Sequence, residues 1–483
     1  MPKFLAMKTS KSRTRGQAAI WMLGTLAASA AVMYAVFNTG QVIVGKERAV
    51  NAADAAALAG ATAEARLLNL MAYANRGVMA NEVFLAQLLS MESWVQYLGN
   101  TSEHIEILLD VISLIPGAAA FAQPAAQVMD KIAMVADKAH SGIQKGINVY
   151  IPVLEGVKTG LKAAEGAIRL GGGLLAEDAA RHMVSANRTD FNGRYDPGVA
   201  VADTNLVKEA TFIKNNAAWM KFTKLYSGNE RGDAKYILEQ SLDAFSAYRP
   251  GRGWLNLSIA VAGMTKNGGS KLQGYDRWES EDTLEMWEWG LCKGLPCKKY
   301  QPIGWGRSNA DQNGSSGSTW SPNRWAQQLA RSDGGTHSRW SGVPALYDVA
   351  DKSPAAREEL GLDFIVAVAR AGANDFSTTK LAMDNVASTS VAGSADLPLK
   401  QQAGQNAAFG KARVFFERPR RGLSNDFTAA GLWRPDQAKE YGSLYSPYWQ
   451  ARLRDLTVVE KGALLTAMGI TPDKAAYTPG GQL

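Results

Sequence analysis

Residues 276–290, DRWESEDTLEMWEWG, combine six carboxylates, five of them clustered at 279–288, with three tryptophans. The clustered acids are Glu279, Glu281, Asp282, Glu285 and Glu288. Paired carboxylates beside aromatic rings are the groups with which glycosidases bind and cleave sugars. Charge runs more often form a solvated face, so we expect an amphipathic helix or hairpin with its acids in water. The spacing does not match an EF-hand calcium loop.

The rest of the sequence nominates no catalytic mechanism. It contains neither a Gly-x-Ser-x-Gly elbow nor a His-Glu-x-x-His motif. Residues 263–271, GMTKNGGSK, lack the Gly-Lys-Ser/Thr ending of a phosphate-binding loop. Residues 375–379, DFSTT, are loosely similar to the metal-ion motif of von Willebrand factor A domains, but no buried strand directly precedes them. We therefore expect no enzymatic activity and no cofactor.

The chain has two cysteines, Cys292 and Cys297, within CKGLPCKKY. A zinc site usually needs two such pairs or added histidines, and the four histidines are scattered. Gly294 and Pro296 favour a turn between the cysteines. The pair predicts a small disulfide-closed loop outside the cytoplasm, or two free thiols in a reducing compartment, so the choice depends on topology.

The basic charge of the chain is concentrated at its N-terminus. The formal net charge is +7, and residues 1–16 hold five basic side chains and no acid. The remainder carries 47 basic and 45 acidic residues, which is nearly neutral. This distribution offers no basic surface for nucleic acid, so we expect no nucleic-acid partner.

A membrane-spanning segment follows this basic leader. Ala18–Phe37 is almost wholly apolar, and no charge occurs between Arg15 and Lys46. Twenty helical residues extend about 30 Å, the thickness of a hydrocarbon core. We expect a transmembrane helix at 17–45, with the leader in the cytoplasm and the remainder on the other side. Four small residues on one face offer self-association through this helix: Gly24, Ala28, Ala31 and Ala35.

Two kinds of proteolytic processing compete with an uncleaved anchor. A signal peptidase could cut after residues 28–30, Ala-Ser-Ala, but the apolar run continues beyond them. A prepilin-type peptidase could cut between Gly16 and Gln17, but its substrates typically carry Glu where this chain has Trp21. We expect the anchor to remain uncleaved.

The helical pattern continues beyond the anchor. Steps of three and four residues connect Leu67, Leu70, Ala74, Gly77, Asn81, Phe84, Leu88, Met91, Val95 and Leu98. This repeat predicts one packing face, used either on the protein's own core or in an intermolecular coiled coil. Gly99-Asn100 should end the helix. We expect residues 46–190 to form a helical stalk or bundle, with corners at Pro116-Gly117, Pro124 and 171–173.

The composition changes near residue 190, where glycine, aromatic and turn residues increase. Residues 254–264, 362–372 and 411–419 predict strands, and 313–320 predicts an exposed loop. We expect an α+β fold: an N-terminal transmembrane helix continues into a long helix and helical stalk, followed by a mixed, mainly antiparallel ectodomain. The Trp-rich ectodomain would occupy 195–460, before a tail at 461–483.

An alanine-rich segment lies just beyond the membrane. It consists of Asn51, Ala52, Ala53, Asp54, Ala55, Ala56, Ala57, Leu58, Ala59 and Gly60. Alanine and glycine give a smooth surface on which another helix can lie close. Glu47, Asn51 and Asp54 share one face at i, i+4 and i+7. This polar stripe either faces solvent or meets the polar groups of a partner subunit.

Residues 15–61 resemble the TadE/TadG-like family of Flp (Tad, tight-adherence) pilus-assembly proteins. The pattern is Arg-Gly, an apolar helix, basic residues and then NAADAAALAGA at 51–61. Residues 67–87, 412–419 and 444–453 are similar to a TadG-like subgroup with large periplasmic ectodomains. The von Willebrand A domain of many TadG-like proteins is not evident.

The resemblance implies a single-pass protein of the bacterial inner membrane, with its bulk in the periplasm. It implies a non-enzymatic structural or interaction subunit whose partners are other Tad/Flp pilus-assembly proteins. A periplasmic location also favours the disulfide between Cys292 and Cys297. The alternative function is a membrane-anchored periplasmic protein that binds or cleaves glycans through the Trp-rich acidic region.

Overall fold

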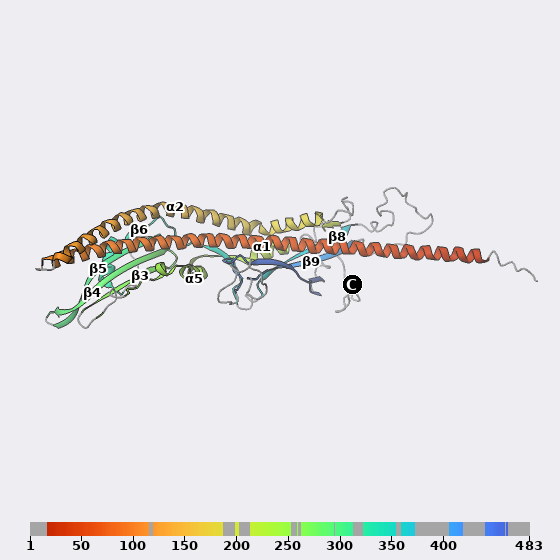
Figure 1. The fold of residues 1–483 in the computed structure, drawn as a ribbon. Coiled ribbons are helices and arrows are strands. Elements are labelled where there is room, and N and C mark those ends of the chain that lie inside the picture. The colour runs from red at the N-terminus through yellow and green to blue at the C-terminus, as the bar shows by residue number, and fades with distance from the viewer. Residues whose placement is uncertain are drawn as a thin grey trace, which may run out of the picture.

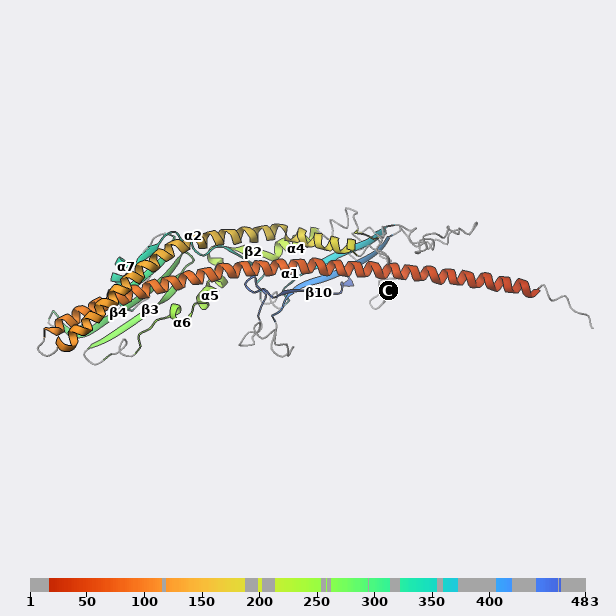
Figure 2. The same cartoon turned by 45° about the horizontal axis from the view of Figure 1, so that its top comes forward.

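Two long antiparallel helices form the axis of a rod-shaped molecule (Figure 1). The computed structural model describes residues 17–114, 119–186, 199–201, 213–252, 258, 262–293, 295–312, 322–353, 359–371, 405–418, 440–458 and 460–461. Helix α1 spans Gln17–Ser113 and helix α2 spans Ala119–Ala186. The N-terminal part of α1 projects beyond all other described elements (Figures 1 and 2). The loop expected at 313–320 and the motif at 375–379 lie outside the described residues.

Helix α1 has 97 residues and is therefore about 145 Å long. The predicted end at Gly99-Asn100 is wrong, because both residues make tertiary contacts that favour a continuous helix. Gly99 lies against Ala136 and Asp137 of α2, and the Asn100 amide donates a hydrogen bond to the carbonyl of Trp305. The corner predicted at 116–117 falls between α1 and α2.

Helix α2 continues through every breaker that should have interrupted it. Pro124 and Pro152 lie inside it, and so do residues 171–173. The prediction of corners there is wrong, and for the glycines the reason is close packing. A Cβ on Gly172 would collide with the indole of Trp219. The glycines therefore let another element approach α2 closely instead of ending it.

Three sheets lie along these helices. The β3–β6 sheet has the order β3 (Ala262–Gln273), β4 (Arg277–Cys292), β5 (Leu295–Asp311) and β6 (Gly335–His337). The β8–β9 sheet has the order β1 (Val199–Val201), β8 (Gly361–Ala371), β9 (Gln405–Phe416) and β10 (Trp449–Leu453). Strands β2 (Thr223–Tyr226) and β7 (Leu346–Val349) pair with each other. All described pairs are antiparallel except β5 with β6.

Short helices complete the described fold. They are α4 (Ile213–Phe222), the 3₁₀ helix η2 (Gly228–Arg231), α5 (Gly232–Gln240), α6 (Ala244–Ala247) and α7 (Arg324–Asp333). The strands predicted at 362–372 and 411–419 correspond to β8 and to the second half of β9. Of the strand predicted at 254–264, the structure describes residues 258 and 262–264, and the last three begin β3.

The helices and strands share their cores. One core joins the alanines of α1 to Phe364 of β8 and Ala176 of α2. A second core joins Leu85 of α1 to Ile151 of α2. It also includes Trp278 of β4 and Trp340, which follows β6. The class is α+β, as predicted, but residues 46–190 and 195–460 pack into the same two cores.

The predicted packing face of α1 is only partly the one that is used. Leu70, Phe84 and Met91 are exposed, whereas Leu68 and Leu85 are buried. The burial is spread over two faces because α1 contacts α2 on one side and the sheets on another. The buried residues of α1 therefore pack on the protein's own core, which is one of the two alternatives that the repeat left open.

The first turns of α1 are exposed throughout. Ala18–Phe37 is the stretch of the described chain that is long and apolar enough to cross a membrane, and none of it is buried. A solvent-exposed apolar segment of this length is costly in water. The segment therefore needs an apolar environment outside this chain.

Candidate functional site

The acidic cluster lies on β4, and its central carboxylates are buried. Glu279, Glu281 and Asp282 are fully buried, and Glu285 is nearly so. Successive side chains of a strand point to opposite faces. Asp282 faces α1, where it meets Ser93, and Glu281 faces α7, where it accepts a hydrogen bond from Gln327. The prediction of a solvated acidic face is wrong, because helices cover both faces of β4.

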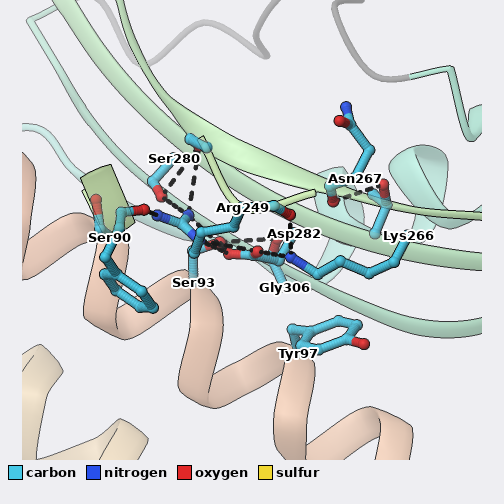
Figure 3. Close-up of polar contacts among 12 residues, drawn as sticks. Ser90, Ser93, Tyr97, Arg249, Lys266, Asn267, Ser280, Asp282 and Gly306 are labelled. Carbon is cyan, nitrogen blue, oxygen red and sulfur yellow. Dashed lines mark hydrogen bonds and ion pairs between the residues drawn. The ribbon is translucent and has the colours of Figure 1, made fainter. Parts of the chain in front are cut away.

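Asp282 is held by two cations and one hydroxyl (Figure 3). The Arg249 guanidinium donates to it at 2.8–3.0 Å, and the Lys266 ammonium donates at 2.7 Å. Ser93 of α1 donates its hydroxyl to the same carboxylate at 2.9 Å. Burial lowers the pKa of Lys266, while the adjacent Asp282 opposes that shift. The group is an ion cluster that attaches β3, β4 and the Arg249 segment to α1.

A glycine allows α1 to approach this cluster. Gly306 on β5 lies directly opposite Asp282 on β4. A Cβ at Gly306 would collide with the carbonyl of Ser93. Only glycine lets the helix backbone and strand approach this closely, and this close approach brings the Ser93 hydroxyl within reach of Asp282.

A second buried carboxylate, Glu92 of α1, binds both α2 and the β3–β6 sheet. It accepts hydrogen bonds from His337 at 2.8 Å and from Ser308 at 2.5 Å, and His140 of α2 lies 3.6 Å away. Burial by itself raises the pKa of Glu92. The nearby His140 imidazole, the hydrogen bonds from His337 and Ser308 and the charge of His337 outweigh burial and lower the pKa to about 2. Glu92 is therefore a carboxylate at neutral pH.

A third buried carboxylate, Glu82 of α1, lies between two buried indoles. Trp278 and Trp340 donate their indole N–H groups to it at 3.1–3.3 Å. Lys158 of α2 approaches it to 3.2 Å. Burial raises the pKa of Glu82, and the lysine and indoles partly offset this rise. We name Glu82, Glu92, Asp282 and their partners the polar cluster; it joins α1, α2 and the sheet.

The three carboxylates of the polar cluster are buried among the described residues. A cavity of about 470 Å³ beside β3 is lined by Ala247, Tyr248, Asn267, Ser270, Lys271 and Pro322. None of the acidic residues lines it. Among the described residues, no group of three or more His, Cys, Asp or Glu side chains is arranged to hold a metal ion.

The tryptophans of the acidic segment do not form an open platform. Trp278 is fully buried. Trp287 lies between Gly263, where a Cβ would collide with its indole, and the Lys298 ammonium, 3.9 Å from its ring centre. Trp289 is half exposed. A sugar stacks on a free aromatic face, and the Lys298 ammonium lies over the Trp287 ring.

Cys292 and Cys297 form a disulfide. It closes the tip of the β4–β5 hairpin, where Gly290 pairs with Cys297 and Cys292 with Leu295. This tip lies at the end of the rod opposite the projecting N-terminal part of α1 (Figure 1).

The alanine-rich segment packs on this chain's own β8–β9 sheet. Ala52, Ala53, Ala56, Ala57 and Gly60 are buried; Ala55 and Ala59 are half buried, and Leu58 is exposed. A Cβ on Gly60 would collide with the Phe364 ring, and one on Gly410 of β9 with the backbone of Ala53. The smooth face that we expected to receive another helix is therefore occupied by strands of the same chain.

The polar residues beside this face lie in different environments. Asn51 and Glu47 are exposed, whereas Asp54 is half buried. Burial and the nearby Asp455 raise the pKa of Asp54. Asp54 thus lies beside another acid of its own chain, and Asn51 faces outward from the described elements.

Sequence reasoning missed two buried carboxylates in the helix pair. Neither oxygen of Glu64 nor of Glu165 has a hydrogen-bond partner among the described residues. Burial, then Glu177, raises the pKa of Glu64 well above its usual value. Burial raises the pKa of Glu165 to about 8, although Lys162 opposes it. The spacing of Glu64 from Ala57 and Gly60, seven and four residues, could have indicated its position on the buried face.

Comparison with known proteins finds a family match for the N-terminal part of the chain. Residues 16–63 match the family model Tad, described as "Putative Flp pilus-assembly TadE/G-like". The match spans the projecting apolar segment and the alanine-rich segment that packs on β8 and β9. No curated protein and no solved structure matches the chain. The resemblance seen in the sequence is confirmed over this segment, which is similar to the TadE/G-like Flp pilus-assembly family.

Proposed function

We propose that this protein is a non-enzymatic structural component of Flp pilus assembly, of the TadG-like type. Ala18–Phe37 anchors it in the inner membrane, and the rod extends into the periplasm. The observation that carries the proposal is the continuity of α1. One helix includes the family's Tad segment, crosses from the exposed apolar anchor into the rod and contacts both large sheets.

This continuity gives the rod a mechanical connection to the anchor. The Tad segment is packed on β8 and β9 through Gly60 and Phe364. Further along α1, Ser93 and Glu92 bind the β3–β6 sheet. Because both attachments are made to one helix, a displacement of the anchor is passed to both sheets.

The chemistry of the described residues supports a role in assembly over catalysis. The acids that suggested a glycosidase, Glu279, Glu281 and Asp282, are buried, and Asp282 is neutralised by Arg249 and Lys266. A general acid must reach the bond that it protonates. The coverage of Trp287 by Lys298 also weighs against a glycan-stacking platform.

The proposal is tested by a clean deletion of the coding sequence, complemented with the full-length chain. Piliation should be lost on deletion and restored by the chain, and other pilus-assembly proteins should co-purify with it from detergent-solubilised membranes. Unchanged piliation in the deletion strain would contradict the proposal. A Trp289→Ala variant is the control, because a glycan-binding role predicts its failure and the assembly role predicts full complementation.

A further inference from the structure

Helix α2 carries a long row of apolar and small residues on its outer face. The row advances in alternating steps of four and three through Phe121, Ala125, Val128, Ile132, Val135, Ala139, Gly142, Gly146, Val149, Val153, Gly156, Gly160, Ala163, Ala167, Leu170 and Leu174. We name it the α2 stripe. Ala125 and Ile132 are half buried and every other member is exposed. The large side chains are truly uncovered: Val149 is 71% exposed, Leu170 66% and Val135 65%.

Among the described residues, nothing packs against the glycines of the stripe. A Cβ built on Gly142, Gly146, Gly156 or Gly160 would meet no atom within 4 Å. By contrast, a Cβ on the glycines that do pack internally, such as Gly172, would collide with a neighbour. Glycine is among the least favourable residues in a helix interior. Four of them on an exposed face indicate a second backbone that approaches α2 closely.

The spacing of the residues in the α2 stripe indicates which kind of secondary structure packs on it. Apolar residues at alternating three- and four-residue spacing are the a and d positions of a left-handed coiled coil. An unbroken series over this length favours a helix as the partner. The 54 residues of the stripe extend about 80 Å, which at a helix width of about 10 Å covers about 800 Å² on each partner. This area is that of a standard stable interface.

We propose that the α2 stripe is the interface between two parallel copies of this chain anchored in the same membrane. Both copies would have their anchors on one side, so their α2 helices would run in the same direction and each stripe position would meet its own equivalent. Gly142, Gly146, Gly156 and Gly160 would then face their counterparts, and the two backbones could approach closely.

The charges beside the stripe are compatible with this pairing. Lys131, Lys138 and Lys145 follow one border of the stripe at seven-residue intervals. In a parallel coiled coil, such a flanking residue faces the position five residues further along the other helix. Those positions are the uncharged Ala136, Ile143 and Tyr150. No lysine therefore meets a like charge, and the lysine stems can cover apolar surface.

The orientation rests on the proposed membrane anchor, while the existence of the interface does not depend on a role in pilus assembly. The test therefore uses the full-length chain in membranes of a host without pili. Failure of the pilus proposal would leave its readout unchanged.

Single-cysteine cross-linking tests the pairing directly. Val128→Cys, Val149→Cys and Leu170→Cys are made one at a time, and each variant is oxidised in the membrane. All three should form a species of twice the monomer mass, because each position meets itself. The control is Ser141→Cys, which is exposed on α2 outside the stripe and should stay monomeric. Cross-linking of Val149→Cys alone, which an antiparallel pair predicts, would overturn the proposal, and so would the absence of double-mass species.

A second variant separates loss of pairing from loss of folding. Gly146→Leu with Gly156→Leu adds side chains where the isolated chain has open space and replaces poor helix formers with good ones. The monomer should retain its helix content and melting temperature, whereas the mass in detergent should fall from dimer to monomer. A variant that stays dimeric at unchanged concentration would contradict close packing at the stripe.

Discussion

The hydroxyl of Ser93 on α1 donates a hydrogen bond of 2.9 Å to the carboxylate of Asp282 on β4, across 189 residues of sequence. Asp282 also neutralises Arg249 and Lys266, both buried. The carboxylate that suggested catalysis in the sequence is therefore the point where the long helix is attached to the sheet.

Removing the Asp282 carboxylate should strongly destabilise the rod. Asp282→Ala leaves the Arg249 and Lys266 charges buried without a counter-ion, and breaking a buried pair in this way costs roughly 3–5 kcal/mol. Urea unfolding of the detergent-solubilised protein measures the change. The control is Asp178→Ala, whose partner His182 is also exposed and whose effect should stay within about 0.5 kcal/mol. Equal effects of the two variants would refute the attachment role.

Replacing Glu92 should change how the free energy of unfolding depends on pH at acidic pH. Its pKa of about 2 lies below the usual 4.5, so its stabilisation is present above pH 4.5 and is lost as the pH falls towards 2. Glu92→Gln should lower stability at pH 7 by roughly 3 kcal/mol and flatten the decline between pH 5 and 2. Unfolding midpoints measured across that range test this, and a parallel shift at all pH values would contradict it.

Glu165 should change the pH dependence of stability in the direction opposite to that of Glu92. Its folded-state pKa of about 8 exceeds the usual 4.5, so the folded state is favoured below pH 4.5 and loses stability as the pH rises from 4.5 to 8. Glu165→Gln should be more stable than the wild type at pH 8 and should lose less stability between pH 5 and 8. The exposed Glu103→Gln is the control for the loss of one carboxylate. A Glu165→Gln profile parallel to that of the wild type would rule out this titration.

Gly60 should be intolerant of alanine although alanine is the better helix former. A Cβ there would collide with Phe364, and overpacking of a core typically costs about 1–3 kcal/mol. Gly166→Ala, on α2 but outside the α2 stripe, is the matched control; a Cβ there would meet no described atom within 4 Å, so the change should be neutral or stabilising by up to about 1 kcal/mol. Denaturant midpoints compare the two variants. If Gly60→Ala were as stable as the control, the contact between the Tad segment and β8 would be wrong.

The disulfide provides a test of the side of the inner membrane on which the β4–β5 hairpin lies. Protein taken from membranes without reductant should not react with a maleimide reagent, because Cys292 and Cys297 are bonded and the bond persists outside the reducing cytoplasm. After reduction, both thiols should react and shift the mass accordingly. A Ser10→Cys leader variant should react only once the inner membrane is opened. Free thiols in the untreated protein would place the hairpin in the cytoplasm.

The long helix, strand β8 and the second half of β9 could be predicted because their signals are local. Continuous apolar runs and periodic spacing lie within the residues that form each element. The end of α1 could not be predicted, because Gly99 and Asn100 favour a terminus on their own. Their contacts with Ala136 and Trp305 overcome that preference.

The polar cluster could not be predicted from the acidic segment alone. A strand with five carboxylates looks solvated unless its covering elements are known, and these come from α1 and α7, far away in the sequence. Arg249 and Lys266 carry no local sign that they would share one buried carboxylate. Ion pairing of this kind becomes favourable only when folding removes the partners from water together.

The amino-acid sequence was sufficient to indicate the candidate membrane span and the Tad segment with its family resemblance, because each depends on residue types at fixed local spacing. The tertiary structure alone decided that Ala53 and Gly60 pack on the chain's own β8 and β9, that Asp282 is buried, and that the outer face of α2 is uncovered. Burial depends on which distant segments meet, and no local pattern contains that information.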